Sequence, residues 1–209
     1  MTEAAPKMRS VRKPKGEGHA RRGEILTAAE QIFVANGYEG ATIRKIAEAV
    51  GLSSTALYLH FRDKAEIFDE ICFEAFSTLL ERQVALAEGE PDAEARLRGL
   101  MLGYIQFGFE NANAYRLAFM TPTMEKADGV EPASRRVAAE LFARFEMGVA
   151  AALDGRIAVE RTRALTQALW ASIHGLVSII VTKPQFDWED RELLIQCQID
   201  LLLKGLRSS

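Results

Sequence analysis

Apolar residues recur at helical spacing along almost the whole chain. Between about residues 19 and 36 they form a stripe made of Ile25, Leu26, Ala29, Ile32 and Phe33. Positions three and four apart share one face of a helix, so the stripe predicts a helix that buries one side. Asn36 and Gly37 then end it, since both tolerate a left-handed C-cap conformation. No stretch alternates as a half-buried strand does, and the sequence predicts an all-α fold.

The same period places further helices downstream. Asp63 is the predicted N-cap of a long helix that reaches about Ala87, with Glu66 three residues later completing a capping box. Breaks at 89–91, 111–113 and 121–132 are rich in Gly, Pro and Asn. The remaining helices are predicted at 92–109, 115–120, 133–153, 157–182 and 188–206.

Residues 42–64, TIRKIAEAVGLSSTALYLHFRDK, have the pattern of two short helices joined by a tight turn. Thr42 and Ser53 are the predicted N-caps, and Gly51 supplies the turn. Leu57 and Phe61 direct the second helix back onto the first. A short polar helix then remains outside, as in a helix-turn-helix, whose second helix lies in the DNA major groove.

Three stretches, FVANGYEG, TIRKIAEAVGLSS and LYLHFRDKAEIF, together resemble the N-terminal DNA-binding domain of the TetR family of bacterial regulators, over residues 23–68. YRLAF at 115–119 and WASIHG at 170–175 resemble the C-terminal ligand-sensing domain of the family branch with a Trp-x-x-x-His-Gly signature. The resemblance implies a homodimer that binds a palindromic operator, acts as a repressor and is released by a small apolar or amphipathic effector.

Composition and resemblance together divide the chain into three parts. Residues 1–18 are expected to be a flexible basic arm, 19–68 the helix-turn-helix domain, and 69–209 the ligand-binding and dimerisation domain. Net charge is +5 over residues 1–22, −1 over 23–64 and −7 over the remainder. A basic start on an acidic body fits a DNA-facing end. A solvated arm that never meets DNA has the same charge.

DNA binding needs cations and amides for phosphates and short polar side chains for base edges. A lysine at position 64 opposes the dipole of the helix it begins, which suggests a separate purpose in phosphate binding. For the others, capping or simple solvation is the alternative reading. We expect DNA contacts from Thr42, Arg44, Ser54, Thr55, Tyr58, His60 and Lys64.

The body carries many aromatic and Met residues, and a packed core explains most of them. The functional alternative is an apolar pocket with a few polar groups. Its candidate lining residues are Tyr104, Gln106, Phe107, Phe119, Met120, Trp170 and His174. His174 shares a helix face with Trp170, and a buried, hydrogen-bonded histidine is the favoured reading for it. No nucleophile–base pair, phosphate loop or metal spacing is present, so no enzyme activity, cofactor or metal is expected.

Wide apolar faces on the last two helices suggest a two-fold helical interface between copies of the chain. The run 164–182 is charge-free but holds several polar residues, which argues against a membrane span. Cys72 and Cys197 sit in apolar patterns and are expected to be reduced core thiols, as in a cytoplasmic protein. The alternative function is a helical small-molecule sensor or interaction protein without strong DNA binding.

Overall fold

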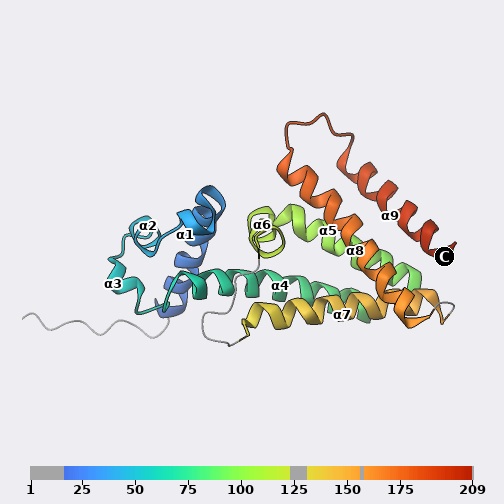
Figure 1. Cartoon of the computed structure of the whole chain (residues 1–209), viewed down its shortest axis with the longest axis horizontal. Coiled ribbons are helices and arrows are strands. Elements are labelled where there is room, and N and C mark those ends of the chain that lie inside the picture. Colours follow the sequence, from blue (N-terminus) through green and yellow to red (C-terminus); the bar gives the residue numbers. More distant parts are fainter. Residues whose placement is uncertain (1–16, 123–130, 156–157, 209) are drawn as a thin grey trace, which may run out of the picture.

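The computed structural model describes residues 17–122, 131–155 and 158–208, and within these ranges it contains helices and no strand (Figure 1). The predicted all-α fold is confirmed. The helices are α1 Glu17–Gly40, α2 Ile43–Ala49, α3 Ser54–Leu57, α4 Lys64–Glu88, α5 Ala93–Glu110, α6 Ala112–Met120, α7 Ala133–Leu153, α8 Val159–Thr182 and α9 Arg191–Arg207.

Most predicted boundaries agree with these helices to within a few residues. α1 is assigned through to Gly40, but Gly37 interrupts it with φ 69° and ψ 170°. The break predicted at Asn36-Gly37 is therefore a kink inside α1. α6 begins at Ala112, so the chain break before it shrinks to Asn111. Residues 1–16 of the predicted arm lie outside the described residues. Residues 17 and 18, which were also assigned to the arm, belong to α1 instead.

The helices α1, α2 and α3 form a small head around a shared core (Figure 1). Phe33, Ile46, Leu57 and Phe61 are its fully buried centre. Local caps set the short helices: the hydroxyl oxygens of Thr42 and Ser53 accept hydrogen bonds from the amides of Lys45 (3.2 Å) and Ala56 (3.1 Å). Gly51 lies at φ 65°, where a side chain would be strained. The predicted caps and turn are confirmed.

One arginine ties the head to α4. The guanidinium of Arg22 in α1 makes two hydrogen bonds with the Glu70 carboxylate of α4. It also donates to the backbone carbonyl of His60, and its Cζ lies 4.0 Å from the centre of the Phe61 ring. A planar fork of this kind holds several partners in a fixed geometry. The head is therefore coupled to the N-terminal part of α4.

α4 is a rod of 25 residues, about 37 Å long at 1.5 Å per residue, that runs from the head into the body (Figure 1). The Asp63 carboxylate caps it by accepting from the Glu66 amide (2.8 Å). The expected capping box is incomplete, because the Glu66 carboxylate accepts from the amide of Arg62 and not from that of Asp63.

The body forms around α4, which packs against α5, α6 and α7. α5 also contacts α8 and α9, which form an outer layer, and α6 reaches back to α1. The close approach of α5 and α8 needs Gly108, since a Cβ there would lie 2.5 Å from Cγ1 of Val177. The expectation for the cysteines holds for one of them: Cys72 is buried, but Cys197 is exposed, because it lies on the outward side of α9.

Candidate functional site

The outer surface of the head is built by α2, α3 and the turn after α3. Thr42, Arg44, Thr55 and Tyr58 are exposed on it, whereas Ser54 and His60 are half-buried. Tyr58 leaves 54% of its surface in solvent. An exposed tyrosine on a short, rigidly held helix is available to an outside partner. Six of the seven predicted residues therefore lie in the segment 42–60 with side chains that are at least partly accessible to solvent.

The polar side chains on this surface can still form hydrogen bonds or ion pairs with an outside partner. The Thr42 oxygen accepts from the amide of Lys45, which leaves its hydroxyl proton free to donate. Arg44 pairs with Glu48 at 2.7 Å, but 83% of the arginine side chain is exposed. Ion pairs in such high dielectric contribute little. A phosphate can therefore compete for the Arg44 guanidinium.

The contacts of Lys64 differ from those expected from the sequence, which suggested phosphate binding as its only purpose. Its ammonium group donates to the backbone carbonyl oxygens of Tyr38 (2.9 Å) and Ala41 (3.4 Å). It also lies 4.2 Å from the centre of the Tyr38 ring. These carbonyls lie at and just beyond the end of α1, where a cation is favourable. Lys64 thus has a structural role in joining α1 to α4.

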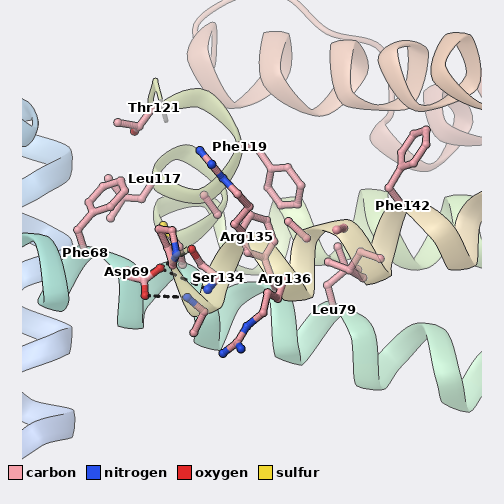
Figure 2. Close-up of a pocket in the computed structure, with 18 of the residues that line it drawn as sticks. Phe68, Asp69, Leu79, Leu117, Phe119, Thr121, Ser134, Arg135, Arg136 and Phe142 are labelled. Carbon is pink, nitrogen blue, oxygen red and sulfur yellow. Dashed lines mark hydrogen bonds between the residues drawn. The ribbon is translucent and has the colours of Figure 1, made fainter. Parts of the chain in front are cut away.

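A large cavity opens in the body between α4, α5, α6, α7 and α8 (Figure 2). Its volume is about 920 Å³, at the upper end of the range for small-molecule sites. Apolar side chains dominate the lining, among them Phe68, Cys72, Phe76, Leu79, Leu100, Leu117, Leu141, Phe142, Phe145 and Ile173. A site of this kind takes a ligand with a substantial apolar part.

Three of the seven predicted lining residues, Tyr104, Phe119 and Trp170, do line this cavity. The other four do not. Gln106 is exposed on the opposite side of α5, and Met120 is partly exposed at the end of α6. Phe107 is buried elsewhere in the core. His174 lies behind the side chains that line the cavity, in a hydrogen-bonded cluster.

That cluster joins α5, α6 and α8. The Nδ1 atom of His174 lies 2.6 Å from the Tyr115 hydroxyl and 3.1 Å from the Tyr104 hydroxyl. The Trp170 indole donates to the Tyr104 oxygen at 3.3 Å. Burial raises the pKa of Tyr104 to about 12 and raises that of Tyr115 as well, so both stay protonated. The favoured reading of His174, a hydrogen-bonded structural histidine, agrees with this geometry.

Burial also lowers the pKa of His174 below its ordinary 6.5, since it disfavours the charged ring. The unfolded chain then binds a proton more readily, so this contribution to stability is complete above about pH 6.5 and is lost as the pH falls below it. We expect His174→Gln to lose less unfolding free energy than the wild type on acidification, in paired denaturant titrations at about pH 8 and pH 5. An equal loss in both proteins would contradict this linkage.

An aspartate on α4 caps α7, a contact that the sequence did not suggest. The Asp69 carboxylate accepts from the amides of Ala133 (3.2 Å) and Ser134 (3.3 Å) and from the Ser134 hydroxyl (Figure 2). Pro132, the residue at the N-cap position of α7, makes no side-chain cap of its own. The first turn of α7 is therefore satisfied by a residue on the neighbouring helix, at the edge of the cavity.

Gln83 is the second residue that sequence reasoning missed. It continues an i+4 row of α4 made of Ile71, Ala75 and Leu79, all buried. A polar residue in an apolar row is the signal that could have identified it. Gln83 is 4% exposed and lines the cavity, and its Oε1 atom has no hydrogen-bond partner among the described residues.

The cavity has an exposed end at the first turns of α4 and α7. Arg62 and Arg135 line it there and are exposed. In Figure 2 the Arg135 side chain extends from α7 toward Thr121 at the end of α6, whereas Arg136 points away. Within the parts of the chain that the structure describes, no ion-pair partner contacts Arg135, and no group of three or more His, Cys, Asp or Glu is placed to hold a metal.

Comparisons with known proteins find two separate matches along the chain. Residues 25–71 match the bacterial regulatory proteins of the tetR family, and residues 97–202 match the tetracyclin repressor-like C-terminal domain. The first match covers most of the head and the start of α4. The second spans just over half of the chain and includes most helices that line the cavity.

The sequence identity between this chain and individual relatives is low. The chain is 32% identical to the HTH-type transcriptional activator FasR of Mycolicibacterium smegmatis over 53% of this chain and 49% of FasR, about half its length. It is 29% identical to the nucleoid occlusion factor SlmA of Edwardsiella ictaluri over 86% of this chain and 94% of SlmA. The fatty acid degradation regulator FadR from Bacillus halodurans has a similar fold, with a TM-score of 0.70 at 19% identity over 91% of this chain and 97% of FadR.

The first matched region corresponds to the helix-turn-helix head, and the second corresponds to the helical body with its internal cavity. The protein belongs to the TetR family of bacterial transcriptional regulators.

Proposed function

We propose that this regulator binds a palindromic DNA operator as a homodimer and is released by an amphipathic small molecule that enters the cavity. The observation that carries the proposal is the position of α4. The same helix is joined to the head through Arg22 and Glu70 and lines the cavity from Ala65 to Gln83. A ligand in the cavity therefore contacts the element that positions the head.

Two connections lead from the cavity to the head. The first is α4 itself, with its Asp69 cap on α7. The second is α6, which lines the cavity through Leu117 and Phe119 and packs against α1. A ligand that fits one arrangement of these helices better than another shifts the population between them. Its effect on operator affinity is limited by that difference in fit.

The outward sides of α8 and α9 fit the interface of the proposed dimer. Ile179 is 48% exposed and Leu201 69%, and Leu193 and Cys197 lie on the same side of α9 as Leu201. By length and composition α8 is also apolar enough to cross a membrane, although the core helix of a bundle passes the same test. We assign its exposed side to a second copy of the chain, in the cytoplasm, because a two-fold pairing of α8 and α9 covers apolar surface on both helices.

The direction of regulation is proposed as repression, since a bound dimer blocks access to the DNA beneath it. FasR, which matches this chain over about half its length, is an activator, so activation is the opposing outcome. A second candidate function is nucleoid occlusion. The match to the nucleoid occlusion factor SlmA, which covers 86% of this chain, favours that alternative.

Footprinting the purified protein on genomic DNA tests the proposal, because it yields the operator and its symmetry. A palindromic footprint supports it, and an absence of protection in dilute buffer refutes it. The proposed DNA contacts are Thr42, Arg44, Ser54, Thr55, Tyr58, His60 and Lys64.

On that operator, we expect Tyr58→Phe to weaken binding about tenfold in gel-shift titrations, because it removes a hydroxyl that donates to a phosphate. Met147→Leu, an exposed position on α7, serves as the control and should bind like the wild type. Equal affinity of Tyr58→Phe and wild type would remove Tyr58 from the interface.

Lys64→Ala distinguishes the two roles of that lysine. If the ammonium also contacts phosphate, binding weakens and the dependence of log affinity on log salt loses about one unit of slope per site. If Lys64 only holds α1 against α4, the thermal stability of the head falls while the slope is unchanged. Two of the three donors of the amine are directed at carbonyls of the head, and the ammonium also lies 3.7 Å from the exposed Glu39 carboxylate. We expect both effects, because an ion pair with so exposed a carboxylate is weak and a phosphate can displace it.

A further inference from the structure

We infer that the effector is an elongated amphiphile whose far end carries a hydroxyl group, and that Gln83 recognises this group. The inference rests on the proposed function only for the use of the cavity as the effector site. It concerns what the deep end of that site selects.

The first observation is the unsatisfied amide. Gln83 is 4% exposed, lines an otherwise apolar part of the cavity, and leaves Oε1 without a hydrogen-bond partner among the described residues. Buried polar groups without partners are rare and costly, because they lose water and gain nothing in return. A ligand group that pairs with the amide recovers that cost. A hydroxyl donates and accepts, so it suits the carboxamide in either orientation.

The second observation is the depth at which Gln83 lies. Asp69, at the exposed end of the cavity, and Gln83 are 14 residues apart on α4, which places them about 21 Å apart along the helix axis. One continuous cavity is lined by both residues. A ligand that fills it from end to end is therefore long and narrow, with one end at the mouth and the other at Gln83.

The third observation fixes the orientation. The exposed end holds Arg135, whose guanidinium has no ion-pair partner among the described residues. The carboxylates of Glu66 and Asp69 at the same end already accept hydrogen bonds from backbone amides, and that of Glu131 is exposed to solvent. The deep end has no cation to offset a charge, since the arginines that line the cavity all lie near the first turns of α4 and α7. An anionic head therefore belongs at the mouth and a neutral polar group at Gln83, because a buried unpaired charge is far more costly than a buried hydroxyl.

Palmitic acid and its ω-hydroxylated derivative are matched probes. An extended chain advances about 1.2 Å per bond, as an extended peptide backbone does, so either probe spans about 18 Å. Calorimetric titration of the full-length wild type should show tighter binding of the hydroxylated acid by about tenfold, the worth of one buried hydrogen bond that would otherwise be missing. In Gln83→Leu the order should reverse, and the ligand-free variant should melt at a higher temperature.

Gln106→Leu is the matched control, because it makes the same change at an exposed site of α5 that does not line the cavity. It should keep the wild-type preference. Equal binding of both acids to the wild type, as expected if water satisfies the amide, overturns the inference, and so does a preference that survives in Gln83→Leu. Binding of neither acid also overturns it. Operator binding is measured in the absence of either acid. A protein that does not bind DNA is thereby distinguished from one that binds DNA but does not recognise the hydroxyl group.

Discussion

The double substitution Ile179→Glu and Leu201→Glu is expected to leave the protein monomeric and to weaken operator binding at least about a hundredfold. Both side chains are largely exposed on the outer layer formed by α8 and α9, and neither supports the core of its own chain. Four carboxylates buried against one another in a two-fold interface would repel and lose their hydration. Two linked heads bind two half-sites with an avidity that a single head lacks.

The mass in solution should be measured by sedimentation, and operator affinity by gel shift, on the same samples. Met147→Glu introduces the same charge at an exposed position of α7 and should remain dimeric with unchanged affinity. A double variant that stays dimeric would place the interface elsewhere. A monomer that binds the operator as tightly as the wild type would contradict the dimeric mode of DNA recognition.

Local signals in the sequence were sufficient for the helices and the head. The predicted caps at Thr42, Ser53 and Asp63 are all present, because an N-cap depends on residues within one turn of it. The kink at Gly37 is also a local feature, because glycine tolerates the positive φ found there. Helix period likewise placed the buried stripe of α1 correctly in large part, with Ile25, Ala29 and Phe33 in the core.

The cavity was predicted less well, because five helices contribute to it and their mutual rotation is not encoded locally. Gln106 and Tyr104 are two positions apart on α5, and such a pair points in different directions, so only one of them reaches the cavity. The partners of two cations were not predicted for a related reason, because they are distant in sequence. Lys64 is held by the carbonyls of Tyr38 and Ala41, and Arg22 by a carbonyl and a carboxylate at and beyond the end of the head.

Asp69→Ala is expected to uncouple the effector from DNA. In the wild type, an effector that favours one arrangement of α4 and α7 should change operator affinity by about 5- to 150-fold. Asp69 is the hydrogen-bonded connection between these helices at the mouth of the cavity, where its carboxylate caps the first turn of α7. Without it, α7 can adjust to a ligand without moving α4, and the ratio of operator affinities with and without ω-hydroxylated palmitic acid should approach one.

A matched variant separates lost coupling from lost stability. Asp92→Ala removes a cap of the same chemistry from α5, where the carboxylate accepts from the Ala95 amide at 2.7 Å, and Asp92 does not line the cavity. Each substitution should lower the unfolding free energy by about 1 kcal/mol, but only Asp69→Ala should lose the response. If calorimetry shows that Asp69→Ala still binds the acid and gel shifts show a full response, the signal reaches the head through α6 and α1 instead.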